Sequence, residues 1–243
     1  MNKFSWHIDK SIVALLKTMK SEYVNDTLTK GRLFFNFPEA FADKSLNLAQ
    51  VDIHDSYQKM NILKPMVFPI VSEDESGIHY GNGISLGETA RLNLISNSNK
   101  HRPICCFRSI KREDLVIGDK ILYALGDISK RIETEFGHDA FVLIWRPVEF
   151  LKRLNKKTLF LAHDVYYGID NQDFLKFMDD MKVEQSAMFQ KDEKYAWQKE
   201  YRIVLPPQRN NGGFPIDIGS IEDIAIAGDI KLLNAGLLFD NSK

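Results

Sequence analysis

The chain has 243 residues, of which 44% are apolar and 27% charged, and its 32 basic residues nearly balance its 33 acidic residues. This composition excludes a mostly disordered or fibrous chain, and the charge balance provides no overall field that would favour nucleic acid or an anionic membrane. No window approaches the ~18–20 apolar residues of a membrane helix and the N-terminus lacks the apolar core of a signal peptide, so we expect a cytoplasmic protein with one domain over residues 1–243.

The N-terminal part is predicted to begin with a helix over residues 9–20, because the apolar residues of this segment recur at helical spacing. A strand over 32–37 should follow Gly31 and stop at Pro38. Residues 67–71 and the segments GIHY and GISL are typical of short strands. Glycine and asparagine tolerate the positive φ of tight turns, so a hairpin turn is expected at 81–83.

The two cysteines, Cys105 and Cys106, are adjacent in the segment RPICCF, which is typical of a strand. Neighbouring residues of a strand point to opposite faces, so a disulfide between these two would be strained and two reduced thiols are expected. Only His101 lies nearby in the sequence. A zinc site needs more ligands at a suitable spacing, so no metal is predicted.

The remaining elements continue the mixed pattern. A helix is expected in ILYALGDISKRIETEF, where apolar residues have helical spacing, and strands are expected in FVLIWR and TLFLAHDVYYG. A further helix is expected in DNQDFLKFMDDMKVEQSAMF, and the strands EYRIVLP and DIAIAGD follow it. Strands and helices without regular alternation indicate an α+β fold, with a mixed, mostly antiparallel sheet and helices packed on it.

Common catalytic motifs are missing from the sequence. The segment GNGISLG fits neither the dinucleotide fingerprint nor the P-loop, the six histidines form no H-E-x-x-H motif, and there is no G-x-S-x-G elbow. The segment KDEKYAWQKEYRIVLPP, residues 191–207, is therefore the most informative one.

Two interpretations of residues 191–207 are open. In the first, Tyr201 and alternate residues after it face the core, while Glu200 and Arg202 are ordinary charges on the other face of the strand. In the second, Glu200 begins a strand beside a cleft, and Gln198 stands two residues before it, so both side chains project into a site on a rigid scaffold.

The order of several segments resembles the bacterial domain of unknown function 2971: GRLFFNFPEAFAD, PICCFRS, DAFVLIW, VYYG and FQKDEKYAWQKEYRIVL. That family tends to show a Phe-Asn-Asp segment, a Cys-Phe-Ser strand and a late Phe-x-Lys signature followed by Trp and Glu-Tyr/Trp-Arg. Here Ala42 replaces the Asn, Arg108 precedes Ser109, and Gln198 stands where Glu is common.

A second resemblance is to the ADP-ribosyltransferase fold, in which a Gln/Glu-x-Glu turn leads into a strand that ends in Leu-Pro. It implies that NAD is a substrate, that Glu200 stabilises the cationic transition state as nicotinamide leaves, and that Gln198 orients the acceptor. Arg32 would hold a phosphate, Ser109 would support the nicotinamide ribose, and Tyr201 would also contact the nucleotide. The chain would then be an NAD-cleaving or ADP-ribosyl-transferring toxin or phage-defence effector.

Two other functions are compatible with the sequence. The same fold could serve as a non-enzymatic binding module, in which Tyr195, Trp197 and Arg202 form a rim for a protein partner. A metal-dependent nuclease could use Asp192, Glu193 or Glu200 together with a lysine.

Overall fold

The computed structural model describes the greater part of the chain. The described residues are 6, 8–42, 58–61, 66–74, 77–86, 91–94, 97–117, 121–123, 125, 127–168, 186–209 and 212–239. The expected helix with its apolar residues Phe174, Phe177, Met178 and Met181, and with Asp170 or Asn171 as its cap, lies largely outside the described residues.

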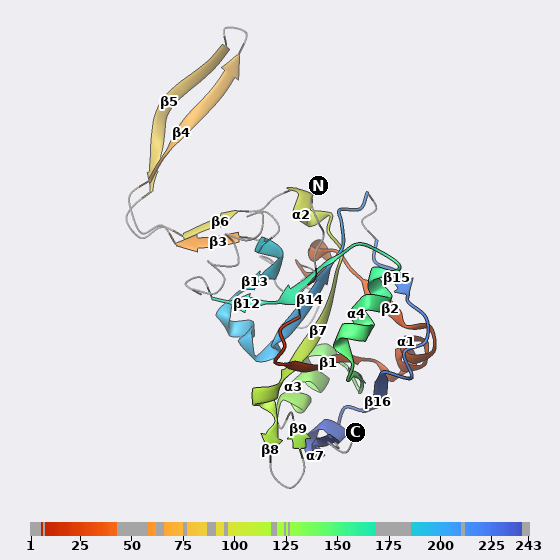
Figure 1. The fold of residues 1–243 in the computed structure, drawn as a ribbon. Coiled ribbons are helices and arrows are strands. Elements are labelled where there is room, and N and C mark those ends of the chain that lie inside the picture. The colour runs from red at the N-terminus through yellow and green to blue at the C-terminus, as the bar shows by residue number, and fades with distance from the viewer. Residues whose placement is uncertain are drawn as a thin grey trace.

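The centre of the molecule is a six-stranded sheet in which every neighbouring pair is antiparallel (Figure 1). Its strands, in spatial order, are β11 (Leu161–Asp164), β14 (Glu200–Val204), β7 (Ile104–Lys111), β1 (Ile12–Met19), β10 (Ala140–Ile144) and β16 (Ala225–Asp229). The α+β prediction, with a mostly antiparallel sheet, is confirmed.

The expected helix over residues 9–20 is wrong, because residues 12–19 form the central strand β1. A strand between two others and covered on both faces is apolar on both sides, so its sequence has no clear alternation. A β-bulge between Ile12 and Ala14 also imitates helical spacing, because it places Ile12 and Leu15, three residues apart, on the same face of the sheet. The helical spacing is thus a product of burial on both sides.

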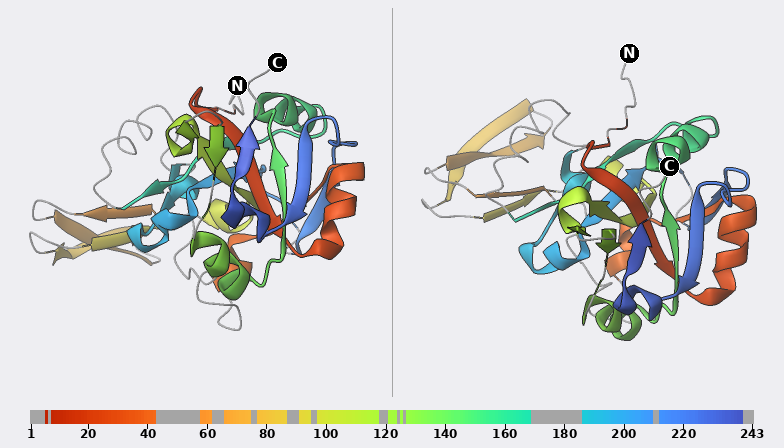
Figure 2. Two further views of the ribbon diagram at one scale, coloured as in Figure 1. Left: turned by 90° about the horizontal axis from the view of Figure 1, so that it is seen from below. Right: turned by 60° about the horizontal axis from the view of Figure 1, so that its bottom comes forward.

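Helices cover both faces of the sheet (Figure 2). On one face α4 (Pro147–Asn155) buries Phe150, Leu151 and Leu154, and α1 (Val24–Lys30) packs beside it. On the other face α3 (Asp127–Phe136) and α7 (Leu232–Ala235) cover the second apolar cluster. Each helix therefore contributes one apolar stripe, as expected for helices on a sheet.

Short elements complete the fold. The 3₁₀ turns are η1 (Ser21–Tyr23), η2 (Pro38–Ala42), η3 (Arg112–Asp114), η4 (Ala187–Phe189) and η5 (Glu193–Gln198), and α2 is Asn97–Lys100. The paired short strands are β2 (Arg32–Phe35) with β15 (Phe214–Asp217), β12 (Tyr166–Tyr167) with β13 (Gln190–Lys191), β3 (Gln58–Asn61) with β6 (Arg91–Leu94), and β9 (Ile121–Tyr123) with β8 (Val116–Ile117) and β17 (Leu237–Phe239).

Most strand predictions are confirmed. One predicted helix begins later than expected, and one predicted turn is absent. The helix expected from residue 121 begins at Asp127, because residues 121–123 belong to β9. The turn expected at 81–83 is wrong: these residues lie within one continuous strand, β5 (Gly77–Leu86), which pairs with β4 (Met66–Asp74). The ladder shifts register there, so Asn82 and Gly83 form a β-bulge between the pairs Phe68–Ile84 and Ile70–Gly81. Figure 1 shows this β4–β5 ribbon extending away from the six-stranded sheet.

Among the described residues, no helix has both the length and the apolar content needed to cross a membrane.

Candidate functional site

One face of the sheet carries a polar patch between two apolar clusters. Along β7, Ile104 and Ile110 belong to separate apolar clusters, and Cys106 and Arg108 lie between them on the same face. Glu200 pairs with Arg108 across the ladder between β14 and β7, and Arg202 pairs with Cys106. Because directly opposite residues share a face, these four side chains meet on it.

Glu200 is the centre of a buried ion triad. Its Oε1 accepts hydrogen bonds from Arg202 Nε at 2.9 Å and lies 2.8 Å from Arg202 Nη2, and its Oε2 accepts one from Lys191 Nζ at 3.0 Å. The exposed fractions are 0% for Arg202, 5% for Glu200 and 7% for Lys191. Arg202 Nη1 also donates to the Met188 carbonyl at 2.7 Å, so the triad attaches η4 and β13 to the sheet.

The triad fixes the ionisation of Glu200. Burial by itself would raise the pKa of this carboxyl, but the charges of Arg202 and Lys191 outweigh burial and hold the pKa well below its usual range. Glu200 is thus a permanent carboxylate near neutral pH. Burial raises the pKa of the Cys106 thiol, and the nearby Glu200 charge adds to this effect, so the thiol stays protonated.

The residue that immediately precedes β14 has a strained backbone. Lys199, which follows η5, has a φ of 43°, and it is the one residue other than glycine with positive φ in the described part of the chain. Its carbonyl accepts hydrogen bonds from the Ser109 backbone N–H at 2.8 Å and from Ser109 Oγ at 3.2 Å. Lys191 Nζ donates to Gln198 Oε1 at 3.0 Å, so the same ammonium group contacts both Gln198 and Glu200.

A pocket opens where β1 and β7 part. Their ladder runs only as far as the pair Leu16–Arg108, after which β1 continues beside β10 and β7 beside β14. Lys17 Nζ donates to the Cys106 carbonyl at 2.7 Å across the gap. The cavity has a volume of about 400 Å³. Its lining consists of Leu16, Lys17, Thr18, Phe34, Asn36, Ala40, Ile104, Cys105, Cys106, Phe107, Arg108, Ile132, Phe136, His138, Lys191, Trp197, Gln198 and Glu200.

The charged side chains of the lining are mainly positive. Lys17, Arg108 and Lys191 are cations, and Glu200 is the carboxylate among the lining residues. Burial and the charge of Lys17 lower the pKa of His138 to about 4, so this imidazole is neutral at pH 7. Three positive charges against one negative charge leave a net charge of +2 on the lining. Such a lining favours an anionic ligand.

Aromatic rings form the opposite wall and the mouth of the pocket. The rings of Phe136 and Trp197 have centroids 5.9 Å apart, and the guanidinium of Arg131 lies 4.0 Å from the Trp197 ring centroid. Phe34, which is 56% exposed, and Phe107 add two further rings to the lining. Flat apolar walls beside cations suit a ligand that has both a planar ring and an anionic group.

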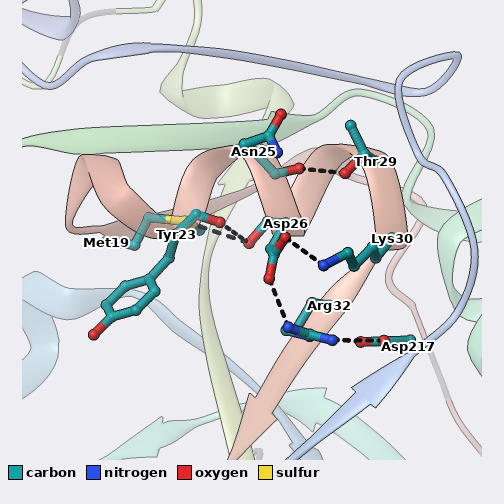
Figure 3. A network of polar contacts seen from close by, with 9 residues as sticks. Met19, Tyr23, Asn25, Asp26, Thr29, Lys30, Arg32 and Asp217 are labelled. Carbon is teal, nitrogen blue, oxygen red and sulfur yellow. Dashed lines mark hydrogen bonds and ion pairs between the residues drawn. The ribbon is translucent and has the colours of Figure 1, made fainter.

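The predicted site residues are only partly brought together. Glu200 and Gln198 both line the pocket, as the second interpretation of 191–207 requires. Arg32 lies outside the lining: its Nη1 donates to Asp26 Oδ2 at 2.6 Å, and its Nε donates to Asp217 Oδ1 at 2.9 Å (Figure 3). Two carboxylates thus occupy this guanidinium, and Arg32 lies apart from the pocket that Glu200 and Gln198 line, so its contact with a phosphate stays a prediction.

Ser109 and Tyr201 face away from the site. Side chains alternate along a strand, so the neighbours of Arg108 and Glu200 point to the opposite face of the sheet. Tyr201 is buried there in the core under α4, and Ser109, which is 3% exposed, pairs with Leu15 of the same core. Neither residue lines the pocket. The structure therefore does not place them beside Glu200 and Gln198, and their contacts with a nucleotide stay predictions.

The proposed rim for a protein partner is also not supported. Arg202 is fully buried in the ion triad, and Tyr195 is buried beneath η5. Trp197 is half-buried and faces Phe136 in the pocket wall. The side chains that were expected to contact a partner thus point inward, because the segment folds back over the sheet.

Sequence reasoning missed Lys17, Thr18, His138 and Lys191. Lys17 interrupts an apolar run, which in a buried strand signals a special role, but the helix prediction for this segment gave Lys17 no role. Lys191 belongs to the Phe-x-Lys segment, so a signal was present. His138 lies far from the site in sequence, and no local pattern marked it.

Over the described ranges, no three His, Cys, Asp or Glu side chains lie close enough to share a metal ion. Comparison with protein-family models, with curated proteins and with solved structures finds no match for this chain.

Proposed function

We propose that the pocket binds a nucleotide, and that NAD or a fragment of it is the first candidate. The observation that supports this most directly is a net charge of +2 in an aromatic-walled cavity of about 400 Å³. Pockets for small ligands have volumes of roughly 300–1,000 Å³, so this one suits a mononucleotide or one half of a dinucleotide. Cations would pair with phosphate, and the aromatic wall would contact a planar base.

Glu200 and Gln198 are the proposed contacts for ribose hydroxyl groups. Oε1 of Glu200 already contacts two nitrogens of Arg202, whereas Oε2 accepts one bond from Lys191 Nζ, so the second lone pair of Oε2 is the proposed acceptor for a ribose hydroxyl. The Gln198 amide offers both a donor and an acceptor beside it. Lys191 contacts both side chains, so it holds them in a fixed relative position.

The three residues of the ion triad all belong to the two segments on which the resemblance to the domain of unknown function 2971 depends. The Lys of Phe-x-Lys and the Glu and Arg of Glu-Tyr-Arg are Lys191, Glu200 and Arg202, which are the three members of the ion triad. We infer that the chain is a divergent relative of the domain of unknown function 2971. A role as a bacterial toxin or phage-defence effector stays a prediction.

The first test is ligand binding by the whole chain. NAD, ADP-ribose, AMP and adenosine are titrated by calorimetry and by thermal shift. A ligand at 100 times its Kd stabilises the folded state by about 2.7 kcal/mol, which raises the Tm by roughly 5–11 °C for a chain of this length. Gln198→Ala should weaken binding about fivefold or more, and the exposed Gln208→Ala is the matched control. Absence of binding by all four ligands would contradict the proposal.

NAD cleavage is a second candidate, supported by the permanent Glu200 carboxylate in the pocket wall. The N-glycosidic bond would break with its electron pair going to nicotinamide, water would add to the ribose C1′, and the proton of that water would pass to solvent. A carboxylate beside C1′ stabilises the positive charge that develops there. Lys191 and Arg202 neutralise part of this effect, so binding is the primary proposal.

Nicotinamide release tests this second candidate. Release by the wild type should fall at least about tenfold in Gln198→Ala and in Glu200→Gln, because both side chains lie where the ribose would be held. Melting curves show whether Glu200→Gln still folds, and Gln198→Ala leaves the ion triad intact. Equal release by wild type and both variants would exclude cleavage by this site.

A further inference from the structure

The two ends of the pocket differ in how their cations are compensated. At the Glu200 end, Lys191 and Arg202 already share a carboxylate. At the β1 end, Lys17 donates to a backbone carbonyl and lies 5.4 Å from the Phe107 ring centroid. In the described part of the chain, no carboxylate forms an ion pair with Lys17. Lys17 is half-buried, so an anionic ligand that reached it would compensate its charge without displacing any carboxylate of the described residues.

Two further polar side chains lie at this end. Thr18 Oγ1 and His138 Nδ1 are 2.9 Å apart, and both residues line the pocket. The ring of Phe136 stacks on His138 with centroids 5.6 Å apart, which fixes the plane of the imidazole. A doubly protonated His138 would donate to Thr18 from Nδ1. The Thr18 hydroxyl and His138 Nε2 would then both be donors for an anion.

The groups around His138 determine when it gains a proton. Lys17 and Lys20 disfavour the imidazolium, and Asp139 favours it. Asp139 is already engaged, since its carboxylate accepts hydrogen bonds from the Ser21 backbone N–H and hydroxyl at 2.7 and 3.0 Å. An anion between Lys17 and His138 would offset the repulsion between these two groups. Its binding should therefore raise the pKa of His138 from about 4 and take up a proton.

We propose that Lys17, Thr18 and His138 form a subsite for the terminal phosphate of the ligand, so that the pocket selects phosphomonoesters such as AMP over nucleosides. This inference rests on the proposed nucleotide site and adds a substrate class to it. A phosphate has three acceptor oxygens and up to two negative charges, and these match one ammonium, one hydroxyl and one imidazole donor. A carboxylate carries at most one negative charge, so it would compensate Lys17 and a protonated His138 less fully than a phosphate dianion.

The experiment compares AMP, adenosine and inorganic pyrophosphate by calorimetry. Wild type should bind AMP at least about tenfold more tightly than adenosine, and Lys17→Met should weaken AMP and pyrophosphate binding by about 10- to 100-fold while leaving adenosine unchanged. Methionine keeps the apolar stem of the lysine. Lys152→Met, on α4 at the opposite face, is the matched control, and Lys17→Arg should restore part of the affinity.

A pH series provides the second readout. The affinity for AMP should depend on pH differently in wild type and in His138→Gln between pH 5.5 and 7.5, because only wild type takes up a proton at His138. AMP itself titrates near pH 6 in both proteins, so the difference between them isolates the histidine.

The outcomes separate this inference from the proposed function. Nucleotide binding that is equal in wild type and Lys17→Met overturns the phosphate subsite and leaves the nucleotide site standing. Pyrophosphate binding that is lost in Lys17→Met, without binding of any nucleotide, supports the subsite and overturns the nucleotide proposal. Absence of both kinds of binding overturns both.

Discussion

Glu200 contacts two cations, and this arrangement decides what its carboxylate can do. A group whose pKa is held far below neutrality cannot exchange protons near pH 7, so Glu200 can act only as a fixed negative charge and a hydrogen-bond acceptor. The cost of burying it is offset by Arg202 and Lys191, and removal of either cation leaves charge uncompensated.

Arg202→Met tests the structural part of this role. Removing one partner of a buried ion pair costs about 3–5 kcal/mol, so we expect a loss of this size in the free energy of unfolding, measured by urea denaturation. Arg32→Met is the control, because its ion pairs with Asp26 and Asp217 are exposed and should contribute less than about 1 kcal/mol. A loss no larger than that of the control would show that the triad does not stabilise the fold.

His138 should make stability depend on pH. Its pKa is about 4 in the folded chain, mainly because of burial, and about 6.5 in an unfolded chain. The unfolded chain therefore binds more protons between these values, so the stability present above pH 6.5 is lost progressively as the pH falls toward 4. The free energy of unfolding should decline from pH 7 to 5.5 more steeply in wild type than in His138→Gln. His101→Gln removes a histidine elsewhere and is the control.

At the scale of elements, glycines with positive φ follow both α1 and α3. Gly31 has a φ of 60° and Gly137 a φ of 65°. Both end their helices in the left-handed conformation that glycine adopts without strain. Their surroundings differ, since a Cβ on Gly31 would collide with the Gly219 carbonyl oxygen, whereas nothing lies within 4 Å of a Cβ on Gly137.

The two glycines form a matched pair for mutation. Gly137→Ala should cost about 1 kcal/mol, because only the positive φ is strained. Gly31→Ala should cost at least about 1 kcal/mol more, because the new methyl group would also collide with the backbone at Gly219 and one of the two segments must move. Urea denaturation of both variants measures the difference. Equal losses would mean that the contact between Gly31 and Gly219 adjusts freely.

For the whole molecule, the pocket depends on how distant segments meet. Its walls come from β1, β2, η2, β7, α3, the loop between α3 and β10, and the segment that runs from β13 to β14. No two neighbouring elements of the chain could form it alone. A bound nucleotide would contact several of these segments at once, so the predicted rise in Tm should appear as one cooperative shift of the whole transition.

Several elements could be predicted because their patterns are local. The alternation of Tyr201 and Ile203 with Arg202 identified β14, and the stripe of α3 identified a helix. Glu200 and Gln198 lie two residues apart at the start of that strand, and both line the same pocket. The roles given to Ser109 and Tyr201 did not agree with strand alternation, because each neighbours a residue that faces the site.

The sequence by itself determined the α+β class, most strand positions and the pair Gln198–Glu200, because these depend on side-chain period and on neighbours in the chain. Only the tertiary structure decided that residues 12–19 form a strand, that Arg202 is buried, and that Lys17 and His138 belong to the pocket. The physical reason is that burial and charge compensation come from partners far away in sequence. The role of a lysine in an apolar run, such as Lys17, cannot be predicted until its neighbours on the adjacent strands are known.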